Sequence, residues 1–153
     1  MQNILCKTDC GHGMMAYKSK ALLVLRLAAG LIFVMHGWDK LTPGGIEIAG
    51  FADMLTKIGW PLFPLFFAWV VALTEFLGGI ALILGIFSRP AGVLLSIVML
   101  VAWGMAKKFA LPAGDADLAL LSIALAIAMT GPGCYSVAGM MMKDKHDMEG
   151  GKK

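Results

Sequence analysis

Charged side chains are scarce in this chain of 153 residues, at 15% of the sequence, whereas a typical soluble domain has about a quarter. Hydrophobic residues make up 59%, and the mean hydropathy is +0.79. This balance excludes an ordinary soluble domain and indicates lipid as the solvent. The net charge is only +3, and most basic residues flank apolar runs. That pattern fits anionic lipid headgroups and excludes a nucleic-acid-binding protein.

Cysteine is also rare, and its count is odd: Cys6, Cys10 and Cys134. No disulfide framework of a small secreted domain can be built from these three residues. A cleaved signal peptide fits poorly as well. The first apolar run begins at Ala21, contains Arg26, and continues into His36–Lys40 where a cleavage site would have small residues. We therefore interpret this run as a membrane helix.

The motifs of most catalytic classes are missing. The chain has no Ser-His-Asp set, Walker loop, dinucleotide-binding glycine fingerprint or haem-attachment motif. Soft side chains that suit Cu(I) or zinc gather near both ends of the chain: Cys6, Cys10, His12, Met14, Met15, Met140–Met142, His146 and Met148. Their spacing matches no defined zinc pattern, so we assign no metal site and leave metal binding by Cys6, Cys10 and His12 open.

Four apolar segments follow one another along the chain: Lys20–Trp38, Leu62–Phe87, Pro90–Lys107 and Asp117–Thr130. A spanning helix needs about 20 apolar residues, which the second segment clears easily and the fourth reaches least well. The predicted fold is all-α, an integral membrane bundle of four helices. We expect one membrane domain over residues 20–137, with cytoplasmic tails at 1–19 and 138–153.

The one long loop, between the first two segments, has a helical pattern of its own. Five apolar residues recur there at helical spacing, interleaved with Glu47, Asp53 and Lys57: Ile48, Phe51, Met54, Leu55 and Ile58. This pattern predicts an amphipathic helix lying flat at the membrane interface. Such a helix either caps the bundle or serves as a lid over a substrate site.

Orientation follows from the lysines and arginines near the ends of the segments. One side of the membrane would hold Lys7, Lys18, Lys20, Arg89, Lys143, Lys145, Lys152 and Lys153, and the other Lys40, Lys57, Lys107 and Lys108. The excess predicts that both termini lie in the cytoplasm. The aromatic residues agree, since Trp38, Trp60 and Trp103 fall at the outer boundary and Tyr17 and Tyr135 at the inner one.

Two ionisable residues lie well inside predicted spans, Arg26 and Glu75. Arg26 is roughly 9 Å from the inner end of its helix, counted from Lys20, and Glu75 is roughly 16 Å from the same end, counted from Ile86. Small residues flank both positions and favour close helix packing: Gly30, Gly37, Ala68, Ala72 and Gly79. We therefore predict an Arg26–Glu75 ion pair. It either fixes helix register or forms a polar site that binds a quinone headgroup or relays protons.

His36 is a third candidate but is not predicted to join that pair, because ten residues, or about 15 Å of helix, separate it from Arg26. It should lie near the outer surface with Trp38, Asp39 and Lys40. An imidazole there either titrates near neutral pH and moves protons, or is simply a solvated interfacial side chain.

Three phrases of the sequence together resemble the DoxX family of membrane proteins. The first is Arg26-Leu-Ala-Ala-Gly30-Leu-Ile-Phe33 with His36-Gly-Trp-Asp-Lys40-Leu41. The second is Glu75-Phe-Leu-Gly-Gly79-Ile-Ala-Leu-Ile-Leu-Gly85 with Ser88-Arg89-Pro90, and the third is Gly131-Pro-Gly-Cys-Tyr-Ser136. The resemblance runs from Arg26 to Ser136 in the family's order. Many relatives have an acidic residue shortly after that serine, whereas this chain reads Ser136-Val-Ala138.

The resemblance implies a four-helix protein of the bacterial inner membrane, similar to the membrane subunit of thiosulfate:quinone oxidoreductase. On this basis Arg26, Glu75 and His36 are the candidate catalytic residues. The candidate cofactor-binding residues are Arg26, Glu75, Lys40 and Arg89. The implied function is that of a membrane subunit of a redox complex handling quinone or thiol- and sulfur-derived reducing equivalents. The chain has no cofactor motif of its own, and quinone is the cofactor that such a site would bind.

Two other functions remain open at this point. The chain could be a non-enzymatic scaffold that anchors a soluble partner at the membrane, or a small transporter, which would require a homo-oligomer because four helices barely enclose a path. The predicted partners are the lipid bilayer and a soluble or membrane-bound redox protein, with no nucleic acid. The sequence leaves homo-oligomer formation and the electron donor undetermined.

Overall fold

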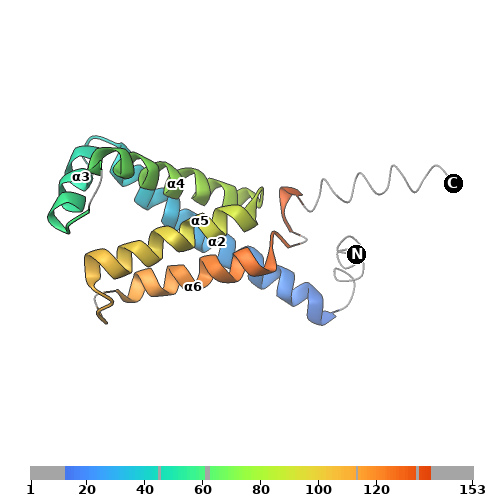
Figure 1. The fold of residues 1–153 in the computed structure, drawn as a ribbon. Helices are drawn as coiled ribbons and strands as arrows, with labels where there is room; N and C mark the ends of the chain where they lie inside the picture. The colour runs from blue at the N-terminus through green and yellow to red at the C-terminus, as the bar shows by residue number, and fades with distance from the viewer. Residues whose placement is uncertain (1–12, 45, 61–62, 113, 134, 139–153) are drawn as a thin grey trace.

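The structure is a computed structural model that describes residues 13–44, 46–60, 63–112, 114–133 and 135–138. Its elements are all helical: α2 (Gly13–Leu41), α3 (Ile48–Lys57), α4 (Pro64–Leu84), α5 (Ser88–Val101), the π-helical turn η1 (Ala102–Ala106) and α6 (Asp115–Thr130) (Figure 1). The predicted all-α fold is confirmed. The cysteines and the histidine and methionine residues considered as soft ligands lie outside the described residues or, at Met14 and Met15, have no described side chain.

The four long helices contact one another in a ring. Helix α2 packs mainly on α4, α4 packs on α5, α5 on α6, and α6 returns to α2. Helix α3 lies across one end of this bundle and contacts α4 and α2; we call this end the α3 end. The start of α2, the α4–α5 turn and the end of α6 lie at the other end, which we call the distal end (Figure 1).

Three of these helices are long and apolar enough to cross a membrane: Tyr17–Leu41, Pro64–Leu84 and Ser88–Ala106. Helix α6 has 16 residues. At 1.5 Å per residue it is roughly 24 Å long, short of the hydrocarbon core of about 30 Å. A fourth crossing by α6 and the direction of the bundle in the membrane therefore stay predictions.

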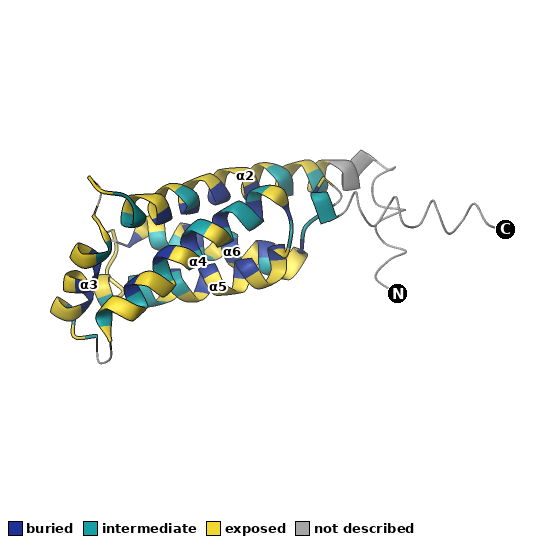
Figure 2. Ribbon diagram, turned by 90° about the horizontal axis from the view of Figure 1, so that it is seen from above, coloured by how far each residue is buried: buried dark blue, intermediate teal, exposed yellow. Residues whose placement is uncertain are grey.

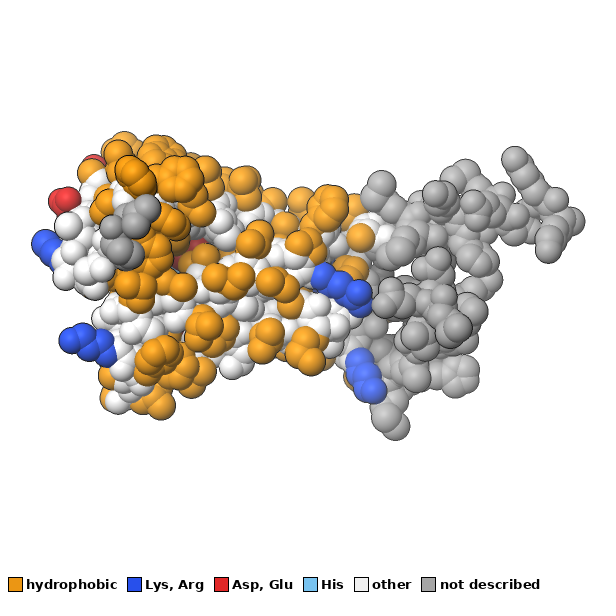
Figure 3. Space-filling model, viewed as in Figure 1, with side chains coloured by type: hydrophobic (Ala, Val, Ile, Leu, Met, Phe, Trp, Pro, Cys, Tyr) orange, Lys and Arg blue, Asp and Glu red, His pale blue; other side chains and the backbone are white. Residues whose placement is uncertain are grey.

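The outer surface of the bundle is apolar. Large hydrophobic side chains point outward from every long helix, among them Leu31, Phe66, Leu77, Leu94 and Met129. Figure 2 shows exposed residues along the outward faces and buried ones facing the middle of the bundle. On the face in Figure 3, hydrophobic side chains cover the middle, and lysine and arginine side chains gather at the two ends. This is the arrangement of a lipid-facing belt between two polar interfaces.

Helices α2 and α4 touch backbone to backbone at two glycines of α2. A Cβ added at Gly30 would lie 2.8 Å from the carbonyl oxygen of Gly79, and one added at Gly37 would lie 2.6 Å from the amide nitrogen of Phe76. The predicted close approach through small residues is therefore present. These contacts also fix the register, with Gly79 lying between Gly30 and Val34 and with Gly37 level with Phe76.

The tightness of this contact gives a testable expectation for Gly37→Ala. The added methyl group overlaps the backbone of Phe76, which cannot move aside as a side chain would, so the two helices must separate. We expect the free energy of unfolding, measured in mixed micelles, to fall by about 1–3 kcal/mol. Gly50→Ala in α3 is the control, because its Cβ would meet only Ile46 Cγ2, at 3.9 Å. If both variants were equally stable, the register would not depend on this contact.

The predicted amphipathic helix is present as α3. Its buried residues are Phe51, Ala52 and Leu55, which form one cluster with Ala68 of α4. The apolar face of α3 therefore covers the first half of α4, and its other face, including Lys57, is exposed. This arrangement is that of a helix capping the bundle, and it places α3 directly over the ionic residues described next.

Candidate functional site

The predicted ion pair between Arg26 and Glu75 is wrong, because Glu75 pairs with Lys40. The glycine contacts explain the error. Gly37 is level with Phe76, so Glu75 lies beside Lys40, which is fourteen residues, or about 21 Å, along α2 from Arg26. The prediction set Lys20 level with Ile86, but α2 begins at Gly13 and extends past the end of α4.

The Lys40–Glu75 pair lies between α2 and α4 at the α3 end. Lys40 Nζ is 2.5 Å from Glu75 Oε2, and the two side chains are 12% and 3% exposed. The ammonium group also donates to the backbone oxygen of His36, at 3.3 Å, and lies 5.2 Å from the ring centroid of Phe51. Three helices therefore enclose this ammonium group, α2 and α4 through hydrogen bonds and α3 through an aromatic face.

Because the pair is buried, the ionised form of each side chain depends on the charge of the other. An ionised carboxylate inside an apolar helix bundle is costly unless a countercharge and hydrogen bonds replace its lost water. Lys40 supplies both to Glu75. A proton or a polar ligand that reaches Glu75 therefore disturbs its pairing with Lys40.

His36 stands beside this pair but not inside it. It is exposed, and the contact it gives Lys40 comes from its backbone oxygen. The prediction that it lies with Trp38, Asp39 and Lys40, away from Arg26, agrees with this position.

Arg26 is 1% exposed and binds backbone carbonyl groups. Its Nε donates to the oxygen of Leu82 at 3.0 Å, and Nη2 donates to that of Ile83 at 3.4 Å. Nη1 donates to the oxygens of Pro132 and, at 3.4 Å, Tyr135. No carboxylate pairs with it among the described residues. The guanidinium therefore joins the last turn of α4 to the segment that follows α6.

Arg89 is also distant from the ion pair. It lies exposed in the first turn of α5 at the distal end, with Nε 2.9 Å from where a Cβ of Gly131 would stand. The structure thus divides the four predicted cofactor-binding residues into two groups. Lys40 and Glu75 meet at the α3 end, whereas Arg26 and Arg89 belong to the distal end.

Sequence reasoning missed a second ion pair near the first. Lys107 Nζ is 2.7 Å from Asp117 Oδ2, and this pair is partly exposed at the α3 end. The sequence could have predicted this pair, because Lys107 ends the third apolar segment and Asp117 begins the fourth, which places both at the same end of the bundle. The indole N–H groups of Trp60 and Trp103 were assigned only to the membrane interface, yet both are buried and have no hydrogen-bond partner among the described residues.

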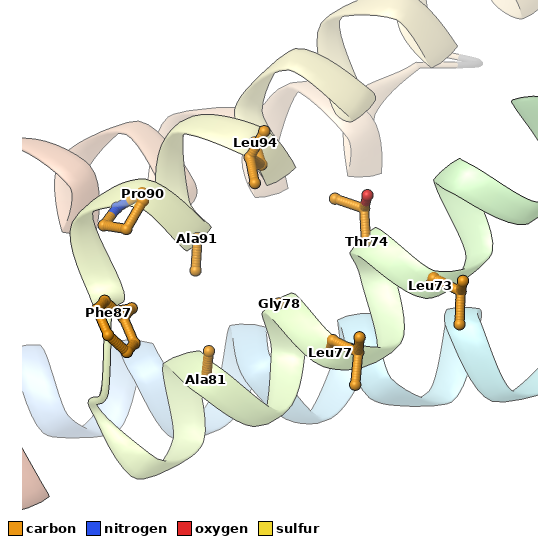
Figure 4. Close-up of a pocket in the computed structure, with 9 residues that line it drawn as sticks. All are labelled: Leu73, Thr74, Leu77, Gly78, Ala81, Phe87, Pro90, Ala91 and Leu94. Atoms are coloured by element: carbon orange, nitrogen blue, oxygen red, sulfur yellow. The ribbon is translucent and has the colours of Figure 1, made fainter.

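An open groove of about 340 Å³ lies between α4 and α5. Figure 4 shows Ala81 and Ala91 facing each other across it, with Phe87 at one end and Thr74 at the other. Its lining is apolar except for Thr74, the residue before Glu75. The groove can hold an apolar chain, but it lacks the ionic groups that would recognise a polar head.

The described residues contain no group of three or more histidine, cysteine, aspartate or glutamate side chains arranged to hold a metal ion. The ion pairs described at the α3 end are Lys40–Glu75 and Lys107–Asp117. An ammonium group can donate to a carbonyl oxygen, and a carboxylate can accept and return a proton.

Comparison with known proteins gives a consistent set of matches. The family model described as DoxX matches residues 21–108. The chain is 32% identical to "Putative oxidoreductase CatD" of Bacillus subtilis (strain 168), covering 80% of this chain and 88% of that protein. It is 29% identical to "Inner membrane protein YqjF" of Escherichia coli (strain K12), over 80% of this chain and 92% of the relative. "Inner membrane protein YphA" of the same strain is 27% identical, over 76% and 86%. No solved structure gives a significant match.

Proposed function

Because the chain belongs to the DoxX family of inner-membrane proteins, we propose that it is the membrane subunit of a redox complex that transfers reducing equivalents from a thiol or sulfur donor to quinone. The observation that carries this proposal is the Lys40–Glu75 pair, sealed between α2 and α4 under α3. The name of one relative, "Putative oxidoreductase CatD", points the same way.

The residues around the pair suit a quinone headgroup. Such a headgroup has two carbonyl acceptors on a flat apolar ring, so it needs hydrogen-bond donors and aromatic walls. Lys40 offers the donor, and Phe51 offers an aromatic face above it. Trp38 and Phe76 lie on the adjoining turns with ring centroids 5.9 Å apart and planes tilted by 33°. Quinone, when bound, supplies the capacity to accept two electrons and two protons.

The chain's own residues would position the headgroup and move protons. Lys40 would donate a hydrogen bond to a quinone oxygen, and Glu75 would carry protons between that oxygen and the aqueous side, where His36 is exposed. The electrons must come from the partner. Two thiols that form one disulfide release two electrons and two protons, which equals what quinone takes up to become quinol.

Access to the pair requires α3 to move. Phe51 lies over Lys40, and the face of α3 that includes Ala52 and Leu55 is buried on α4. In this proposal α3 is therefore a lid as well as a cap, and lifting it opens the pair toward the interface. The contact between α3 and α4 is a single small apolar cluster, which is weak enough to open and close during turnover.

Quinone binding tests the proposal directly. A short-chain ubiquinone and a menaquinone are titrated into the purified protein in nanodiscs, with tryptophan quenching as the readout. The test variant is Lys40→Met/Glu75→Leu, in which both charges are removed together so that no buried charge is left alone. We expect its affinity for the preferred quinone to fall at least about ten-fold, the value of one charged hydrogen bond.

The control is Lys57→Gln, which removes one positive charge from the exposed face of α3 at the same end of the bundle. Its affinity should equal that of the wild type. Equal affinity of the double variant and the wild type would contradict the assigned site. Co-purification with a cytoplasmic enzyme but no quinone binding by the wild type would favour a scaffold instead.

A further inference from the structure

A second groove lies at the distal end, between the start of α2 and the end of α6, with a volume of about 370 Å³. These two helices run antiparallel and meet less closely than α2 and α4, because α6 packs chiefly on α5. The space between them is open on the outer side of the bundle. It is far from the Lys40–Glu75 pair, which lies at the opposite end of the bundle (Figure 1).

The lining of this groove changes from polar to apolar along its length. Lys18 and Ser19, near the start of α2, and Thr130, the last residue of α6, line its mouth. Leu25 lies seven residues after Lys18, and Ala126 lies four residues before Thr130, so they are roughly 10 Å and 6 Å deeper along the helix axes. A ligand that fills the groove therefore needs a polar head and an apolar chain.

The charges at the mouth are positive. Lys18 is exposed on the α2 side. On the α6 side, the guanidinium of Arg89 lies against Gly131, the residue after Thr130, with Nε 2.9 Å and Nη2 3.4 Å from the position of a Cβ there. Neither cation forms an ion pair among the described residues. Lys18 lines the groove, and Arg89 reaches the residue that follows Thr130, so two cations at this end complement an anionic head.

We propose that this groove binds one anionic phospholipid. Lys18 and Arg89 hold the phosphate at the interface, Ser19 and Thr130 line the level of the glycerol, and one acyl chain lies along Leu25 and Ala126. This site gives a role to Arg89, which the ion pair leaves without one. A quinone tail or a second copy of the chain would use the apolar lining equally well, but neither would explain two cations at the mouth.

Lipid titration followed by native mass spectrometry tests this site on the full chain in mild detergent. Phosphatidylglycerol and phosphatidylethanolamine with identical acyl chains are compared, so that only the headgroup charge differs. We expect the wild type to prefer the anionic lipid by roughly 25-fold, which is about five-fold for each of two cations. In Lys18→Gln/Arg89→Gln that preference should disappear while the affinity for the neutral lipid stays unchanged.

Two further variants separate a specific site from general attraction. Ala126→Phe fills the apolar part of the groove from an exposed position, so the protein should fold normally and lose the tightly bound anionic lipid. Lys57→Gln/Lys108→Gln removes the same amount of charge from exposed positions at the α3 end and should keep the full preference. The proposal is overturned by equal affinities for both lipids in the wild type, by an equal loss in this control, or by unchanged binding in Ala126→Phe.

Discussion

Lys40→Met is expected to lower the free energy of unfolding by about 3–5 kcal/mol, because it leaves the carboxylate of Glu75 buried without a countercharge. Glu75→Leu should cost less, since Lys40 is 12% exposed and its long side chain can turn toward the interface. When Lys40→Met and Glu75→Leu are combined, apolar groups of similar volume replace both ions. We expect that double variant to come within about 1 kcal/mol of the wild type.

Unfolding in mixed micelles, followed by tryptophan fluorescence, measures all three variants as a double-mutant cycle. Lys107→Gln is the matched control, because it breaks an ion pair at the same end whose lysine is 34% exposed. A pair exposed to that degree contributes at most about 1 kcal/mol. If Lys40→Met were no more harmful than Lys107→Gln, the Lys40–Glu75 pair would not be buried as the structure has it.

The same double variant separates a structural from a functional role of the pair. If the pair only fixes helix register, the folded double variant keeps quinone binding, because the glycine contacts between α2 and α4 hold the register by themselves. If the pair is the polar site, the double variant folds and quinone binding is lost. A functional pair is therefore expected to show as lost quinone binding in a double variant that keeps near wild-type stability.

Arg26→Ala is expected to be the most damaging substitution outside that pair, with a loss of about 3–6 kcal/mol. The guanidinium donates to carbonyl groups of the last turn of α4 and of the segment after α6. Without it the oxygens of Ile83, Pro132 and Tyr135 lose this donor, whereas that of Leu82 keeps the backbone amide of Gly85 at 3.2 Å. Each unsatisfied buried acceptor costs about 1–3 kcal/mol. The measurements are the free energy of unfolding and the amount of protein in the membrane.

Arg26→Lys should recover less than half of that loss. A single ammonium group lacks the planar fork that lets the guanidinium reach Leu82 on one side and Pro132 on the other. Arg89→Gln is the control, because its side chain is exposed at the same end of the bundle. An Arg26→Ala protein with wild-type stability would show that the hydrogen bonds of Arg26 contribute nothing to stability.

The contacts of Arg26 also bring together the three phrases of the sequence that resemble the DoxX family. Gly85 ends α4 with a φ of 72°, which favours glycine, and a Cβ there would lie 2.5 Å from Cβ of Ser136 and 2.8 Å from Cζ of Arg26. Residues from the first, second and third phrases therefore meet at one point of the distal end. This clustering favours a structural role for Arg26.

Much of the fold was predictable because hydrophobicity is a local property. Apolar runs long enough to span lipid gave three of the long helices closely, and the spacing of Phe51 and Leu55 gave the buried face of α3. The close approach of α2 and α4 followed from their small residues. The chain itself dictates these features, because each depends on which side chains follow one another and on the solvent around them.

Which charge meets which was decided only by the tertiary structure. Depth counted from helix ends placed Arg26 opposite Glu75, but the contacts at Gly30 and Gly37 shift the register and bring Lys40 there instead. The partners of Arg26 could not be found from sequence at all, because they are backbone carbonyls, and every residue has one. The local hydrophobic pattern determines which segments form helices. The pairing of charged side chains depends instead on the register of two rigid helices, which a few contacts between their backbones set.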